Sequence, residues 1–210
     1  LPLLAAPLLT RMCTPQEMGA YSVWLGVIAL SAIGATLRME AAMILDHEQA
    51  HQRTCFRVVF YSATVAALLL TLLATAVRLA GFAPALHLPW AALLTIGAGA
   101  WLTACMQTTL AYATSHNAFG KAARAKVVTA AVIVLTQLAM LYAGLGGSGL
   151  IAGHLCGLLA GYLYARRLLH PPRAPIAWLP DPDQRAYLRR HQDFWRYSLP
   201  SNLLNGAVSQ

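Results

Sequence analysis

The sequence predicts an all-α, polytopic membrane helix bundle. Of its 210 residues, 58% are hydrophobic and only 10% are charged, whereas soluble domains carry about 25% charged residues. The apolar residues form runs of membrane length, separated by short polar or Gly- and Pro-containing connections. The net charge of +8 does not indicate nucleic-acid binding, because the basic residues lie between apolar runs.

The apolar runs define the expected elements in order. We expect a first lobe over residues 1–165, with spans at about 1–9, 20–45, 58–77, 90–112, 127–143 and 150–165. Thr14, Pro15 and Glu17 fit a capping box that starts the second span. The chain begins at Leu1 without Met and ends inside an apolar stretch, so we expect a fragment.

A polar segment separates these spans from a further one. Residues 166–196 are expected to form a linker with a stiff Pro-containing stretch, and residues 197–210 open a seventh span. Six spans, a linker and the start of another set are typical of a two-lobed transporter. The chain then holds the first six-helix lobe and the start of the second.

Lys and Arg are distributed unevenly among the connections. Arg11 and Arg78 belong to one set, and all others outside the spans belong to the second: Arg53, Arg57, Lys121, Arg124, Lys126, Arg166, Arg167, Arg173, Arg185, Arg189, Arg190 and Arg196. Basic loops stay in the cytoplasm. We therefore expect the loops after the second, fourth and sixth spans to be cytoplasmic.

Small residues in the sixth span predict close helix packing. Gly153, Gly157 and Gly161 repeat the GxxxG spacing, which lets helix backbones approach in a membrane. We favour packing inside the bundle over a specific dimer face. The four cysteines are scattered without CxxC spacing and are read as small buried hydrophobes, so neither a disulfide nor a metal cluster is expected. No cofactor is expected either.

Two ionisable residues, Arg38 and Glu40, lie within the second apolar run. At membrane depth such residues cost several kcal/mol unless they are paired or face water. Residues two apart on a continuous helix point about 200° apart, so we predict that these two do not pair with each other. Arg38 shares its face with small residues only, namely Ser31, Gly34, Ala35, Ala41 and Ala42. We expect Arg38 to face a cavity that can hold an anion, and Glu40 to hold this helix against a neighbour.

A second interpretation of Arg38 stays open. The apolar run can end at Leu37, and Arg38 is then an interfacial anchor whose side chain reaches the headgroups. Against this, the chain is apolar again from Ala41 to Leu45. On a continuing helix, Arg38 lies about 12 Å inside the end.

Polar residues also open the seventh span. Ser198, Asn202 and Asn205 are spaced i, i+4, i+7 and share one helix face. A polar face in a membrane helix indicates a cavity wall more than lipid contact.

The stretch from His47 to His51 matches the HExxH pattern of zinc proteases. It lies in the most polar loop of the chain, and no convincing third ligand follows it. We interpret these residues as solvated loop residues, with an intramembrane zinc protease kept as a distant alternative.

Three blocks of this sequence resemble a known family. Residues 8–21 (LLTRMCTPQEMGAY), 35–45 (ATLRMEAAMIL) and 197–205 (YSLPSNLLN) are similar to segments of bacterial polysaccharide-biosynthesis flippases. These are the O-antigen and capsule translocases of the multidrug/oligosaccharidyl-lipid/polysaccharide exporter superfamily. Residues 47–51 depart from the family, where an acidic loop is usual.

The resemblance implies a transporter and not an enzyme, in the bacterial inner membrane. Its cargo would be a polyprenyl-pyrophosphate-linked oligosaccharide, moved by alternating access, with glycosyltransferases and a polymerase of the same pathway as further partners. Arg11 and Arg38 map onto cationic positions that face the central cavity. The alternative within this superfamily is an exporter of small cationic drugs, which would favour acidic cavity residues instead.

Overall fold

A computed structural model describes residues 7, 9, 11–45, 48–81, 90–172 and 182–209. Every regular element within these residues is a helix. In chain order they are α2 (Pro15–Thr36), α3 (Met39–Leu45), α4 (Gln49–Leu79), α5 (Trp90–Ser115), α6 (Phe119–Tyr142), α7 (Gly146–Leu169), α8 (Pro182–Arg190), the π-helical turn η2 (Phe194–Ser198) and α9 (Leu199–Ser209). Among the described helices, α2, α4, α6 and α7 have the length and apolar composition needed to cross a membrane. The predicted all-α, polytopic bundle is confirmed, while most of the expected first span lies outside the described residues.

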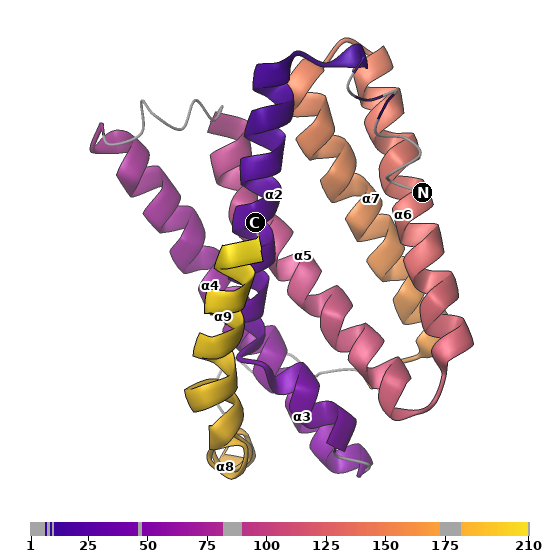
Figure 1. The fold of residues 1–210 in the computed structure, drawn as a ribbon. Coiled ribbons are helices and arrows are strands. Elements are labelled where there is room, and N and C mark those ends of the chain that lie inside the picture. Colours follow the sequence, from indigo (N-terminus) through magenta and orange to yellow (C-terminus); the bar gives the residue numbers. More distant parts are fainter. Residues whose placement is uncertain are drawn as a thin grey trace.

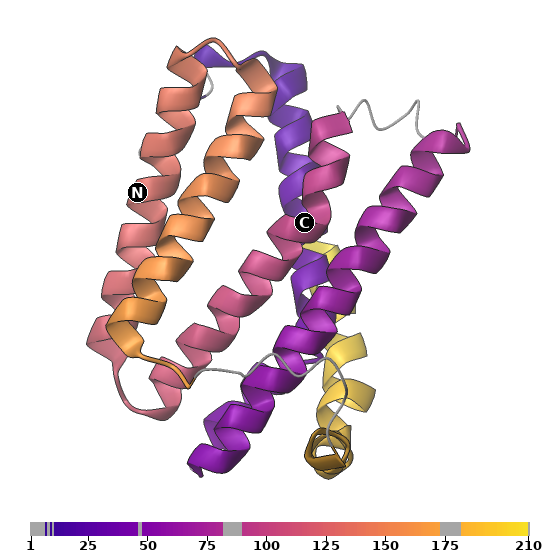
Figure 2. The ribbon, with the colours of Figure 1, turned by 180° about the vertical axis from the view of Figure 1, so that it is seen from behind.

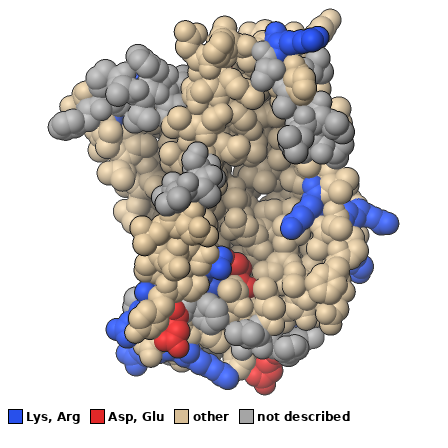
Figure 3. Space-filling model, viewed as in Figure 1, with Lys and Arg blue, Asp and Glu red and all other residues tan. Residues whose placement is uncertain are grey.

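The bundle has two distinct ends. The start of α4, the α5–α6 connection, the end of α7 and α8 lie together at one end, at the bottom of Figures 1 and 2. We call this the basic end, because Lys and Arg gather mainly over the lower part of the molecule (Figure 3). The starts of α2 and α7 lie at the opposite end, which we call the Glu17 end. The predicted basic loops therefore share one end of the bundle.

Helix α5 lies in the middle of this arrangement. It packs against α2, α4 and α7. Gly97 faces Ala67 and Thr71 of α4, and Gly99 faces Ile28 of α2, so these glycines allow the close approach of the neighbouring helices. One core cluster joins Trp24 and Ile28 of α2 to Leu93 and Ile96 of α5. This central packing holds α2 in place along most of its length.

The α6–α7 hairpin is held by the glycines of α7. A Cβ at Gly153 would lie 2.7 Å from the Cα and N atoms of Gln137 on α6, and Gly157 and Gly161 face Ile133 and Thr129 in the same way. Thr136 adds a 2.6 Å hydrogen bond from its hydroxyl to the Gly153 carbonyl. The GxxxG repeat thus packs helices inside the bundle, as predicted.

The start of α2 forms the predicted capping box. The Thr14 hydroxyl accepts from the Glu17 N–H at 3.3 Å, and a Glu17 carboxylate oxygen accepts from the Thr14 N–H at 2.9 Å. The other carboxylate oxygen accepts from the Gly147 N–H at 2.7 Å. Glu17 therefore caps its own helix and joins it to the start of α7.

The expected continuous helix over residues 20–45 is interrupted at Leu37 and Arg38. Both residues have left-handed backbones, with φ of 51° and 58°, a conformation that costs about 1–2 kcal/mol for a residue with a side chain. Side chains of α4 stabilise the break, since Ser62 donates to the Ala35 carbonyl at 2.6 Å and Cys55 donates to the Met39 carbonyl at 3.3 Å. The chain thus ends α2 and restarts as α3 in a new direction (Figure 1).

Candidate functional site

Arg38 and Glu40 form an ion pair at this break. The Arg38 Nη1 atom donates to Glu40 Oε1 at 3.3 Å. The prediction that the two side chains point apart is wrong, because it assumed an unbroken helix. The left-handed backbone at Arg38 brings its side chain to the same side as that of Glu40. Glu40 therefore pairs with Arg38, and its predicted role in holding this helix against a neighbour stays a prediction.

The pair leaves bonding capacity unused. The side chains of Arg38 and Glu40 are 28% and 14% exposed, yet Arg38 Nε and Glu40 Oε2 are buried and have no hydrogen-bond partner among the described residues. A guanidinium has five N–H donors, so a single bond to Glu40 leaves most of them available. An anion that reached this pair would find an incompletely satisfied cation.

A groove runs beside the last turns of α2. It has a volume of about 450 Å³ and lies between α2, α4 and α9, lined by Leu30, Ser31, Gly34, Ala35, Ala66, Leu69, Leu70, Leu73 and Leu203. Ser31, Gly34 and Ala35 are among the small residues that were expected to surround Arg38. Arg38 itself is not a lining residue, and it follows Gly34 by four positions. The groove is therefore mostly apolar, and its last lining residue on α2, Ala35, lies three positions before Arg38 in the chain.

Arg11 lies far from this pair. It is exposed and precedes α2 at the Glu17 end, whereas Arg38 follows the last residue of α2. The 22 residues of α2 span about 33 Å at 1.5 Å per residue. The structure does not bring Arg11 and Arg38 together, and the two guanidinium groups do not reach one pyrophosphate in this conformation.

The polar residues that open the last span form a local network. The Asn202 amide donates to the Ser198 carbonyl at 2.8 Å and to its hydroxyl at 3.3 Å, while Asn205 is exposed. The described groove is lined from α9 by Leu203 and not by these polar residues. Their predicted role as a cavity wall therefore stays a prediction.

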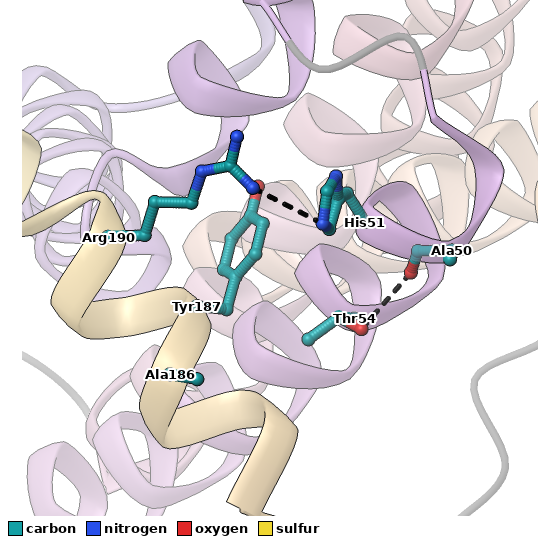
Figure 4. A pocket seen from close by; sticks show the side chains of 6 residues that line it. All are labelled: Ala50, His51, Thr54, Ala186, Tyr187 and Arg190. Carbon is teal, nitrogen blue, oxygen red and sulfur yellow. Dashed lines mark hydrogen bonds between the residues drawn. The ribbon is translucent and has the colours of Figure 1, made fainter.

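The described part of the HExxH stretch contacts the linker. His51 Nδ1 lies 3.0 Å from a Glu48 carboxylate oxygen, and the Arg190 guanidinium lies 3.4 Å from His51 Nε2 (Figure 4). His47 lies outside the described residues, among which no three His, Cys, Asp or Glu side chains gather as metal ligands would. His51 thus takes part in a contact between α4 and α8.

The linker contains a helix that sequence reasoning missed. Tyr187 of α8 is 4% exposed and packs in a cluster with Met39, Met43, Cys55 and Val59 of α3 and α4. Gln184, Tyr187 and Leu188 follow the i, i+3, i+4 spacing of a helix face, which is the signal that was available. Helix α8 is therefore docked on the bundle next to the segment that carries Arg38 and Glu40.

Sequence reasoning also missed a polar cluster inside the bundle. The Tyr21 hydroxyl lies 2.8 Å from His154 Nδ1, and the Gln137 amide donates to the Tyr21 oxygen at 2.9 Å. Each residue is an isolated polar side chain in an apolar run, and such residues are candidates for function on that ground alone. The cluster joins α2, α6 and α7.

Comparison with known proteins adds the family. A family described as "polysaccharide biosynthesis protein" matches residues 8–169. The chain belongs to this polysaccharide biosynthesis family. The matched residues include both ends of α2, the α3 segment with Arg38 and Glu40, and the Tyr21–Gln137–His154 cluster. Neither the curated proteins nor the solved structures contain a match to this chain. The resemblance seen in the blocks at residues 8–21 and 35–45 is confirmed at the level of the family, whereas the block at residues 197–205 lies outside the matched residues. The chain is a polytopic membrane protein.

Proposed function

We propose that this chain forms the first lobe of a flippase for polyprenyl-pyrophosphate-linked oligosaccharides in the bacterial inner membrane. The cargo would serve O-antigen, capsule or exopolysaccharide synthesis. The observation that carries the proposal is the Arg38–Glu40 pair, a partly buried cation with unused donors at a strained helix break. Membership in the polysaccharide biosynthesis family supports the substrate class.

The chemistry of the cargo requires a buried cation. A pyrophosphate cannot cross hydrocarbon without a partner, because an isolated charge in an apolar medium carries a large desolvation cost. Arginine stays charged and presents a planar fork that matches phosphate oxygens. In the proposed mechanism Glu40 holds the Arg38 guanidinium while the site is empty, and the pyrophosphate replaces Glu40 when the cargo binds.

The apolar groove fits the rest of the cargo. Apart from Ser31, its lining consists of alanine, glycine and leucine residues of α2, α4 and α9, and its last lining residue on α2, Ala35, precedes Arg38 by three positions in the chain. A polyprenyl chain that stays at the bundle surface would contact such walls without losing a polar partner. The pyrophosphate and the lipid would then occupy adjacent sites, the ion pair and the groove.

The proposed orientation places the basic end in the cytoplasm, since loops rich in Lys and Arg stay on that side. Arg38 then meets the cargo on the side where lipid-linked oligosaccharides are assembled. Arg11 lies at the other end of α2 and would meet the pyrophosphate only after translocation. The two arginines would act in sequence in an alternating-access cycle, which fits their separation by a full helix.

Replacement of Arg38 in the full-length protein tests this function. Hydrogen bonds to charged groups contribute about 1.5–3 kcal/mol each, so Arg38→Ala is expected to reduce surface polysaccharide about tenfold or more at equal expression. Arg38→Lys keeps the positive charge but loses the planar guanidinium, so we expect a level of surface polysaccharide between those of the wild type and Arg38→Ala. The matched control is Arg124→Ala, which removes an exposed arginine of α6. Surface polysaccharide at the wild-type level from Arg38→Ala would contradict the proposal.

A further inference from the structure

A pocket lies between α4, α5 and α7, apart from the proposed cargo site. It has a volume of about 270 Å³, and its lining includes Phe60 of α4, Thr109 of α5 and Arg166 of α7. Figure 2 shows α5 lying between α4 and α7 in the lower part of the bundle. The pocket shares no lining residue with the groove beside α9, and Arg38 does not line it. It is therefore a separate candidate site.

Arg166 is the only charged residue among the described residues that line this pocket. It has no carboxylate partner among the described residues. The hydroxyls of Thr108 and Thr109 donate at 2.8 Å to carbonyls within α5, so they offer no hydrogen-bond donor to a ligand. The pocket thus presents one guanidinium without a counter-charge, which favours an anion as its ligand.

The Arg166 side chain folds back along α7, away from the basic end. Its guanidinium lies 5.7 Å from the centre of the Tyr162 ring, which belongs to the preceding helical turn. An arginine that only anchors a helix extends outward to the headgroups, whereas this guanidinium is directed to the pocket wall. A cation–π contact does not neutralise the charge, so the guanidinium remains able to bind an anion.

The position of the pocket matches that of a lipid headgroup. Arg166 lies three residues, or about 4.5 Å, before the end of α7, and the headgroup region is about 5–7 Å thick on each side of a bilayer. Leu159 and Leu163 precede Arg166 at helical spacing and are 45% and 50% exposed. This apolar face suits an acyl chain and leads to the guanidinium. Basic pockets between transmembrane helices are typical sites for anionic headgroups.

The size of the pocket limits its ligand. Pockets for drug-sized ligands measure about 300–1,000 Å³, so this smaller pocket suits a single headgroup and not an oligosaccharide. The chain turns at His170, which follows α7 with a left-handed backbone (φ 48°), and Pro171 and Pro172 of the linker then line the pocket. A bound headgroup therefore contacts three helices and the start of the linker.

We propose that this pocket binds the phosphate headgroup of an anionic phospholipid from the membrane leaflet at the basic end. The Arg166 guanidinium binds the phosphate oxygens, and an acyl chain lies along Leu159 and Leu163. Because the lipid binds the folded lobe, it stabilises the contacts of α4, α5 and α7. A soluble phosphate has the charge but not the acyl chain, so it is the weaker ligand. This site does not depend on the proposed flippase function.

Photolabelling of the full-length protein tests the site. Purified protein in a neutral detergent, at physiological ionic strength, is mixed with a phosphatidylglycerol that carries a diazirine in its acyl chain, and crosslinked residues are mapped by mass spectrometry. We expect labelling of α7 near Leu163 in the wild type. In Arg166→Ala we expect about tenfold less labelling, the effect of one lost hydrogen bond to a charged group.

The matched control for this experiment is Arg167→Ala. It removes an exposed arginine that is next in the chain and does not line the pocket, so labelling near Leu163 should persist. Equal labelling of the wild type and Arg166→Ala at this position would overturn the proposal. An equal loss in both variants would also overturn it, because the lipid would then respond only to surface charge.

Competition separates a lipid from a soluble anion. Unlabelled phosphatidylglycerol should abolish the labelling near Leu163, whereas phosphatidylcholine, which has no net charge, should compete weakly. Excess glycerol phosphate should leave the labelling unchanged. If phosphatidylcholine competes as well as phosphatidylglycerol, the pocket binds only acyl chains. If glycerol phosphate does so, the pocket belongs to a soluble phosphate. Either result would overturn the proposal.

Thermal unfolding gives a second readout. A ligand that binds only the folded state raises the unfolding midpoint. Phosphatidylglycerol should therefore raise the midpoint of the wild type and Arg167→Ala by more than that of Arg166→Ala. An equal increase in all three proteins would overturn the proposal.

Discussion

The Arg38 guanidinium lies 3.3 Å from the Glu40 carboxylate, although only one residue separates the two in the chain. This contact exists because Leu37 and Arg38 adopt left-handed backbones between α2 and α3. Contacts from α4 to the Ala35 and Met39 carbonyls stabilise the break. The site is therefore created by a backbone feature, and its side chains act as a pair.

The backbone at Leu37 can be tested by comparing two truncations. Leu37→Gly and Leu37→Ala both remove the packing of the Leu37 side chain beyond Cβ, but glycine adopts φ of 51° without strain. We expect the glycine variant to be more stable by about 1 kcal/mol, measured as the free energy of unfolding in detergent micelles. On a continuous helix the order is reversed, because alanine is favoured over glycine by about 1 kcal/mol. A more stable alanine variant would show that the helix does not break here.

Removal of one partner of the ion pair is expected to cost more than removal of both. Arg38→Ala leaves the Glu40 carboxylate without a partner, which lowers the free energy of unfolding by about 1–3 kcal/mol. The side chains of Arg38 and Glu40 are 28% and 14% exposed, so solvent screening favours a value at the lower end of this range. The double variant Arg38→Ala/Glu40→Ala should recover the unfolding free energy while surface polysaccharide stays low. Recovery of both properties together would mean that Arg38 serves stability alone.

The glycine contacts of the hairpin predict a position-dependent effect of alanine. Gly153→Ala places a Cβ 2.7 Å from backbone atoms of Gln137, and overpacking of this kind costs about 1–3 kcal/mol. The control Gly19→Ala meets no atom within 4 Å and should be neutral or stabilising. Thermal unfolding of both variants checks the difference, and equal midpoints would contradict the tight α6–α7 contact.

The docking of α8 predicts protection of the linker. Tyr187→Ala removes a side chain that is 4% exposed, and loss of a buried aromatic costs about 3–5 kcal/mol of local stability. Trypsin should then cleave at Arg189 and Arg190 much faster than in the wild type. Tyr142→Ala, at a 90% exposed tyrosine, is the matched control. Unchanged cleavage of the Tyr187 variant would show that α8 is not held on α4.

Amino-acid composition and the pattern of apolar and basic residues were sufficient to predict the fold class, the gathering of the basic loops at one end of the bundle and the start of α2. The capping box at Thr14 and Glu17 and the glycine stripe of α7 depend on local sequence, so they could be read before the structure. The same local rules placed a helix through Leu37 and Arg38. Both residues favour helices and no Gly or Pro marks the break, which depends on Ser62 and Cys55 from another helix.

The remaining site residues were hidden by sequence distance. Tyr21 and His154 are 133 positions apart, and Tyr21 and Gln137 are 116 apart. Nothing local to one helix shows that these three polar side chains meet. Helix α8 was obscured for a different reason, since its charged and Pro-containing surroundings resemble a linker and only Tyr187 and its neighbours mark a buried face.

The central claim is that Arg38 binds the pyrophosphate of a lipid-linked oligosaccharide before translocation through this bundle. The most direct test is the initial rate at which purified full-length protein moves such a lipid across proteoliposomes, compared between the wild type and Arg38→Ala. The account predicts a rate at least about tenfold lower for Arg38→Ala, with the rate of Arg124→Ala unchanged. Equal rates for the wild type and Arg38→Ala would contradict it.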